Sequence, residues 1–200
     1  MTTSRIQAFS DGVFAILITI MVLYLRQPHG STFHGLRAPL PSFYAYGLSF
    51  SLLATYWNNH HHLLNVVRRV TPGLMWANNN LLFWLSLIPF VTAWMAENSF
   101  AVDTVVVYGA ECVMAAVAYT ILQTLIVASH GRDSRLRAAL GSDLKPKLSA
   151  SGYALAIPLA FISRWVSVAF FVIVALSWFI PDRRLQDFIE AGTGKVVADS

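Results

Sequence analysis

Few residues of this chain could do chemistry, and those that could stand inside long apolar segments. Asp11 lies near the start of the first apolar run, residues 60–62 are three consecutive histidines, and Glu111 is an isolated acid. A carboxylate or an imidazole in such surroundings is costly unless a partner holds it, and such residues either tie helices together or relay protons. The pattern favours a structural polar network over a proton path.

The histidine triplet invites a metal site, but its spacing argues against one. Consecutive residues on a helix point about 100° apart, so His60, His61 and His62 cannot converge on one ion. Metal sites need three or four converging ligands, and the chain has only 6 His in total. We predict neither a metal site nor a cofactor.

One stripe of the first apolar segment, 4–26, has a distinct composition. On a helical wheel of about 100° per residue, Gly12, Thr19, Ile20 and Leu23 fall within about 60° of Ile16. Small and aliphatic stripes of this kind favour close packing between helices in a membrane. The pattern by itself favours such packing, and the lining of a conduit is the alternative.

The composition is that of an integral membrane protein. The 200 residues are 56% hydrophobic and only 12% charged, and the mean hydropathy is +0.57, well outside the range of soluble domains. The chain has a formal net charge of +4, but its basic residues lie in short loops and form no stripe with interleaved aromatics. We therefore expect the lipid bilayer, and no nucleic acid, as a partner.

Six apolar segments predict an all-α, polytopic fold with six transmembrane helices. They form a single domain over residues 1–200, with a charged tail at 181–200, and cover about 4–26, 43–67, 74–95, 104–128, 149–162 and 165–180. The fifth segment, at about 21 Å of helix, is short for a bilayer.

The distribution of basic residues predicts the orientation of these segments. If they alternate across the membrane, 11 of the 14 Lys and Arg residues fall on one side, and Arg26, Arg37 and Arg164 fall on the other. By the positive-inside rule, both termini face the cytoplasm of a multi-pass protein in the cell membrane.

The first segment also resembles a known family. Arg5, followed by Phe9-Ser10-Asp11-Gly12-Val13, then Ala15-Ile16 and Thr19, is similar to the first helix of the transmembrane protein 175 family of potassium channels. The stretch Trp57-Asn58-Asn59-His60 resembles the second-helix WxxH of that family, and Asn80 with Ile88-Pro89-Phe90 resembles its third helix. The likeness covers most of residues 4–180.

This resemblance implies a channel and not an enzyme. The first helix would line a central pore in a homotetramer, with Ile16, Thr19 and Leu23 at the lining positions and Gly12 and Ile20 beside them. Rings of Ile16 and Leu23 offer no oxygen to an ion, so they would act as hydrophobic constrictions that favour K⁺ without a carbonyl filter. Monovalent cations would be the permeant species, and other copies of the chain the protein partner.

The resemblance further implies a structural polar network of the residues Arg5, Phe9, Ser10, Asp11, Trp57, His60 and Asn80. Asp11 and His60 fall at similar depth, about 9 and 12 Å from the cytoplasmic face, so we expect His60 or Arg5 to pair with Asp11 across a contact between subunits. Two alternatives remain: a proton-coupled transporter that uses Asp11 and His60, with Glu111 as a further candidate, and a non-conducting membrane scaffold.

Overall fold

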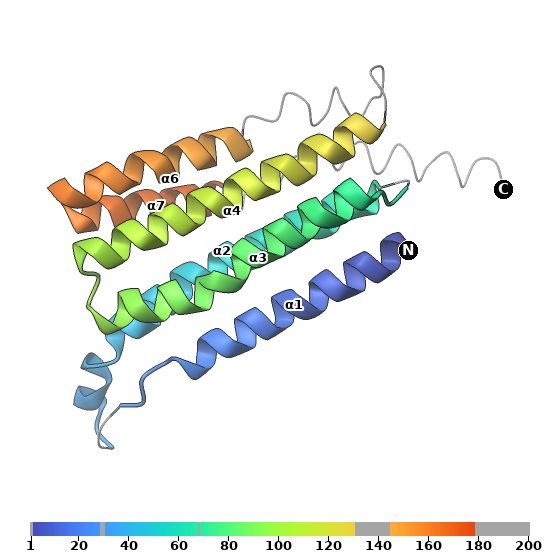
Figure 1. The fold of residues 1–200 in the computed structure, drawn as a ribbon. Helices are drawn as coiled ribbons and strands as arrows, with labels where there is room; N and C mark the ends of the chain where they lie inside the picture. The colour runs from blue at the N-terminus through green and yellow to red at the C-terminus, as the bar shows by residue number, and fades with distance from the viewer. Residues whose placement is uncertain (1, 29–30, 68, 131–144, 179–200) are drawn as a thin grey trace.

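The predicted all-α architecture is confirmed. A computed structural model describes residues 2–28, 31–67, 69–130 and 145–178, which form six long helices and one short 3₁₀ helix, η1 (Figure 1). They are α1 (Thr3–Leu23), η1 (Phe33–Arg37), α2 (Leu40–Asn65), α3 (Pro72–Glu97), α4 (Val102–Ser129), α6 (Lys145–Ile162) and α7 (Arg164–Ser177). The expected tail at 181–200 and most of the basic connection after α4 lie outside the described residues.

Local sequence explains where these helices begin. At α3, the Thr71 hydroxyl accepts a hydrogen bond from the Leu74 amide at 3.2 Å, and Pro72 occupies the first turn. A threonine cap and an early proline are both favourable because the first amides of a helix lack partners within it. Between α6 and α7, Ser163 is extended, with φ −157° and ψ 116°, so the chain reverses there without a long loop.

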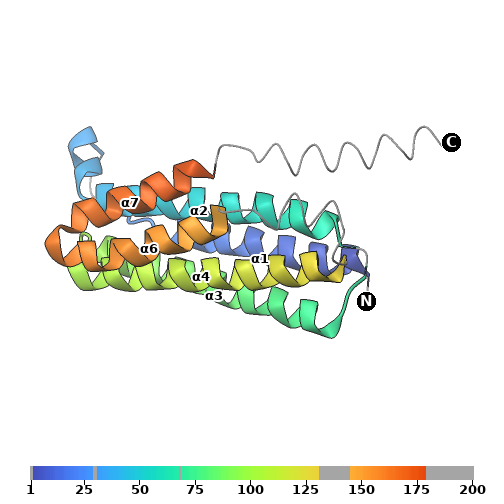
Figure 2. The same ribbon diagram turned by 90° about the horizontal axis from the view of Figure 1, so that it is seen from above.

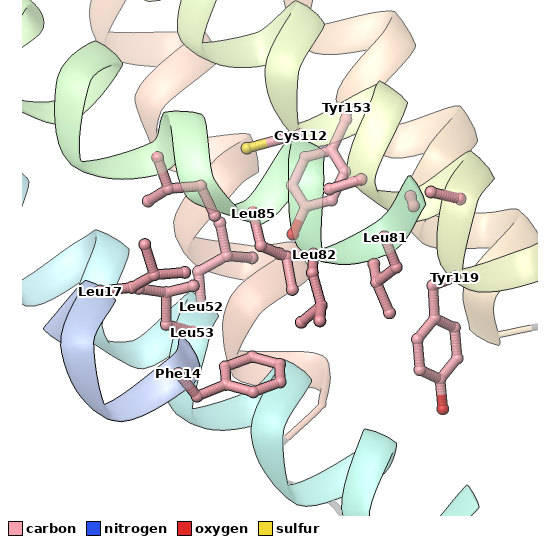
Figure 3. Close-up of a cluster of buried hydrophobic side chains, with 14 of the residues drawn as sticks. Phe14, Leu17, Leu52, Leu53, Leu81, Leu82, Leu85, Cys112, Tyr119 and Tyr153 are labelled. Atoms are coloured by element: carbon pink, nitrogen blue, oxygen red, sulfur yellow. The ribbon is translucent and has the colours of Figure 1, made fainter. Parts of the chain in front are cut away.

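Successive helices run up and down, so the starts of α1 and α3 lie at one end of the bundle and the α6–α7 turn at the other (Figures 1 and 2). Helix α1 packs on α2 and α3 at one side, whereas α6 and α7 pack on α4 and each other at the opposite side. Side chains from α1, α2, α3, α4 and α6 meet in one apolar core (Figure 3).

Three of the described helices are long and apolar enough to cross a membrane by length and composition: α1, α3 and α4. Helix α2 has 26 residues, but its end carries Asn and His side chains that lower its hydropathy. The fifth helix is longer than the predicted 149–162, because α6 already begins at Lys145 and has 18 residues. Its first turn is basic, so hydropathy does not reveal it. The sixth helix has 14 residues.

Two glycines allow the outer helices to approach closely. A Cβ built on Gly109 of α4 would lie 3.0 Å from the Phe171 ring and 3.1 Å from Ile157, and one on Gly152 of α6 would lie 2.9 Å from Val174. Small residues at such contacts let transmembrane helices pack backbone to backbone. The half of the bundle formed by α4, α6 and α7 is therefore tightly interlocked.

Candidate functional site

Helix α1 has one buried face and one exposed face. Ile6, Ser10, Phe14, Leu17 and Met21 are buried against α2 and α3. These residues lie about 80–160° around the helix from Ile16 on a wheel of 100° per residue. Helix α1 lies at one side of the bundle (Figure 1), and the face around Ile16 is not covered by the other helices that the structure describes.

The uncovered face is a straight stripe of small and apolar residues. Ile16 is 59% exposed and Leu23 is 76% exposed, and Gly12 and Thr19 are exposed as well. Phe9, 58% exposed, stands seven residues before Ile16. The spacing of three and four residues along this stripe is the one that lets helices of several chains pack side by side around a common axis. We call these five residues the α1 stripe.

Ile20, which we expected beside the lining positions, is only half-exposed. It lies about 40° from Ile16 on the wheel, at the edge of the α1 stripe. It is less exposed in the single chain than Gly12, Ile16, Thr19 and Leu23.

Thr19 is the polar residue of the α1 stripe, and its hydroxyl has a defined orientation. Its Oγ1 donates to the Ala15 carbonyl oxygen, 2.8 Å away. A hydroxyl that donates its hydrogen to the backbone keeps its lone pairs available as acceptors. An oxygen with lone pairs on an exposed face is suited to coordinate a cation.

A buried polar triad fixes α1 to its neighbours. Asn78 of α3 donates from Nδ2 to Ser10 Oγ at 3.1 Å, and its Oδ1 lies 2.7 Å from His60 Nε2. Because the amide oxygen accepts, His60 must donate from Nε2, which assigns its tautomer. All three side chains are buried. Asn78 was not among the predicted network residues, since the family resemblance pointed to Asn80.

Asp11 forms its hydrogen bond elsewhere. Its Oδ1 accepts from Trp57 Nε1 at 2.9 Å, so the expected pairing of Asp11 with His60 or Arg5 is replaced in the single chain by one with Trp57. Arg5 is exposed and falls on the line of the α1 stripe.

The remaining expected network residues are placed as follows. Phe9 belongs to the α1 stripe, and Asn80 is exposed. Of the seven residues, the structure therefore brings Ser10 and His60 together through Asn78, and Asp11 and Trp57 in a separate pair.

The three consecutive histidines face different neighbours. His60 meets Asn78, whereas Gln7 of α1 lies 2.8 Å from His61 Nδ1 and also donates to Asn65 Oδ1 at 3.1 Å. Within the described ranges, no group of three or more His, Cys, Asp or Glu side chains could hold a metal ion.

Two further polar features lie in the core beyond α1. Ser49 Oγ is 2.7 Å from Thr92 Oγ1 and 3.0 Å from Tyr108 Oη, which links α2, α3 and α4. Glu111 of α4 is 5% exposed, and neither of its oxygens has a hydrogen-bond partner in the part of the chain that the structure describes.

Comparisons with known proteins agree with this geometry. The sequence model of the family described as "Endosomal/lysosomal potassium channel TMEM175" matches residues 5–89, which include most of α1, all of α2 and most of α3. Potassium channel HX13_20290 of Chryseobacterium sp. (strain P1-3) is 46% identical over 186 residues, covering 93% of this chain and 97% of the relative.

The fold has a solved counterpart. The crystal structure of a lysosomal potassium-selective channel TMEM175 homolog from Chamaesiphon minutus superposes with a TM-score of 0.75 at 29% sequence identity, over 90% of this chain and 97% of that chain. A human relative called "Endosomal/lysosomal proton channel TMEM175" is 30% identical over 113 residues, half of this chain but 22% of its own length.

These relatives are ion channels and not enzymes. The bacterial relative is matched over nearly its whole length at high identity, and the solved homolog shares the fold over nearly all of its chain. The first-helix motif around Asp11 lies inside the matched region. This chain therefore belongs to the TMEM175 family of potassium channels.

Proposed function

We propose that this protein is a potassium-selective cation channel in which the α1 helices of four copies line a central pore. The observation that carries the proposal is the α1 stripe, an exposed and nearly apolar face on a helix whose opposite face is buried. One chain supplies a single such helix, so a closed conduit requires several copies, and closed rotational symmetry is the usual form of a homo-oligomer.

Rings of α1 side chains would then control permeation. At 1.5 Å per residue, the rings of Ile16 and Leu23 stand about 10 Å apart along the axis, with Thr19 between them. An apolar ring dewets when narrow and passes a partly hydrated ion when wider, so it gates and filters together. The Thr19 oxygens, with their hydrogens turned to the backbone, would stabilise a cation between the two constrictions.

The orientation proposed for the chain follows from its charges. Arg26, Arg37 and Arg164 belong to connections at the end of the bundle opposite the N-terminus. Most other basic residues fall in the N-terminal, second-to-third, fourth-to-fifth and C-terminal connections of the sequence. The positive-inside rule then assigns both termini to the cytoplasm.

The contacts of Asp11 and His60 support a channel over a proton-coupled transporter. A transporter of that kind would route protons through both side chains. Here Asp11 is hydrogen-bonded to Trp57, and His60 is hydrogen-bonded to Asn78, so the two belong to separate contacts. Both contacts join helices of one chain, which is the role of a structural network.

The reversal potential across a planar bilayer, with K⁺ on one side and Na⁺ on the other, tests the proposal. The reversal potential of the native protein should be displaced toward the K⁺ equilibrium potential, and Ile16→Asn should shift it toward zero because a polar ring admits hydrated Na⁺. Ile173→Asn is the matched control, since Ile173 of α7 is similarly exposed, at 62%, but far from α1.

Two results would contradict the proposal. If the native protein carries no current, it is not a channel. If the native protein and Ile16→Asn have equal selectivity, the α1 stripe is not the selectivity filter. The mass of the purified assembly tests the stoichiometry separately, since each chain is 22.2 kDa.

A further inference from the structure

A large apolar groove lies between α2 and α7, away from the α1 stripe. It has a volume of about 440 Å³, and its lining includes Gly47 and Ser51 of α2 and Trp165, Val168, Val172 and Ala175 of α7. This volume is within the range of about 300–1,000 Å³ that is typical of small-molecule sites. The groove lies between two helices of a membrane protein, so it opens to lipid or to another protein chain.

The groove exists because α2 presents small residues there. A Cβ built on Gly47 would meet nothing within 4 Å, which means that the space beside its backbone is open. The nearby Ser51 hydroxyl donates to the Gly47 carbonyl oxygen at 2.8 Å. The hydroxyl therefore has no free hydrogen to offer a ligand, and most of the other lining side chains are apolar. An apolar chain is the occupant that fits this lining.

A positive charge stands beside the groove. The guanidinium carbon of Arg164 lies 5.4 Å from the centroid of the Trp165 ring, and that ring is part of the groove lining. Arg164 is itself exposed at the first residue of α7. Arginine binds phosphate through a planar fork of donors, and tryptophan is common at the level of lipid headgroups. The apolar groove and its charged end together match an anionic phospholipid.

We propose that the groove between α2 and α7 binds an anionic phospholipid, with an acyl chain along Gly47 and the phosphate at Arg164. Helices α7 and α1 lie on opposite sides of the bundle (Figure 1). In a tetramer built around α1, which is the function proposed above, the groove faces the bilayer and not a second copy. The lipid would bind at the periphery and brace α2 against α7.

Native mass spectrometry of the purified protein tests this site, because it reports bound lipids and the number of chains in the same spectrum. The probes are dioleoyl phosphatidylglycerol and dioleoyl phosphatidylcholine, which carry the same acyl chains but differ in net charge. We expect phosphatidylglycerol to bind the native protein more tightly. Arg164→Gln should weaken its binding about fivefold, the contribution of one basic residue at an anionic surface, and leave phosphatidylcholine unchanged.

Filling the groove tests its apolar part. Gly47→Leu places a side chain in the open space beside α2, and it should reduce the binding of both lipids. Ala169→Leu is the control, since Ala169 is exposed on α7 outside the groove lining, and Arg37→Gln is the control for charge at the same end of the bundle. Both controls should bind lipid as the native protein does.

Three outcomes would overturn the site. If the native protein binds the two lipids equally and Arg164→Gln has no effect, Arg164 does not bind the lipid phosphate. If Gly47→Leu binds lipid as the native protein does, the groove is not the lipid-binding site. A change in the number of chains on Gly47→Leu, without loss of lipid, assigns the groove to a second copy. A native assembly other than a tetramer contradicts the proposed pore instead, and the lipid result then stands on its own.

Discussion

Removal of the Asn78 side chain tests whether the buried triad holds α1 in place. Asn78→Leu keeps the approximate size of the side chain but leaves His60 Nε2 and Ser10 Oγ, both in the buried triad, without their partner. In membranes, one such hydrogen bond contributes about 0.6 kcal/mol on average and about 1.7 kcal/mol at most. Two lost bonds therefore predict a loss of about 1–3 kcal/mol in the free energy of unfolding.

Thermal unfolding of the purified protein measures this loss. For a chain of this length, about 1 kcal/mol corresponds to roughly 2–4 °C, so Asn78→Leu should lower the Tm by roughly 2–12 °C. Asn80→Leu is the matched control, since Asn80 is exposed two residues along the same helix.

A double variant distinguishes a lost hydrogen bond from a packing defect. His60→Phe can keep its ring contact with Phe14, whose centroid is 5.6 Å from that of His60. If both partners of a buried bond are replaced by apolar groups, neither is left unsatisfied. His60→Phe with Asn78→Leu should therefore cost less than the sum of the two single changes. Additive effects, or a larger loss from Asn80→Leu than from Asn78→Leu, would refute the assignment of the triad.

Two further predictions use the same stability assay. Gly109→Ala should lower the Tm, because the new methyl group meets the buried ring of Phe171 at 3.0 Å. Gly47→Ala meets open space and should raise the Tm slightly, because alanine has a higher helix propensity than glycine. A lower Tm for Gly47→Ala than for Gly109→Ala would contradict the packing described for α4 and α7. Asp11→Asn should change the free energy of unfolding by less than about 0.5 kcal/mol, since its amide oxygen still accepts from Trp57 and the pair is exposed. A large loss would mean that the charge of Asp11 is required, as a proton path or a subunit ion pair would demand.

The number of helices and the position of the α1 stripe follow from the sequence for a simple reason. Length and hydropathy set the spans, and a step of about 100° per residue sets which side chains share a face. Both are properties of one helix at a time. The start of α6 at Lys145 was not predicted, because the first turn of the helix is basic and extends beyond the apolar stretch.

The partners within the triad could not be obtained in that way. Residues 78–80 are three consecutive asparagines, and their directions on α3 differ by about 100° per step. Only the packing of α3 on α1 and α2 decides which of them is buried, and it selects Asn78. The link from Ser49 to Tyr108 is likewise a contact between residues 59 positions apart, which no local pattern indicates.

The triad and the α1 stripe are physically connected through the rotation of α1. Ser10 lies about 120° around the helix from Ile16, so the bond from Asn78 to Ser10 determines the direction in which Ile16 points. The apolar residues on the same buried face, such as Phe14 and Leu17, resist tilting but discriminate weakly between small rotations. A hydrogen bond depends steeply on distance and angle. The polar triad is thus the feature best suited to keep the α1 stripe directed away from its own bundle, where other copies of α1 can meet it.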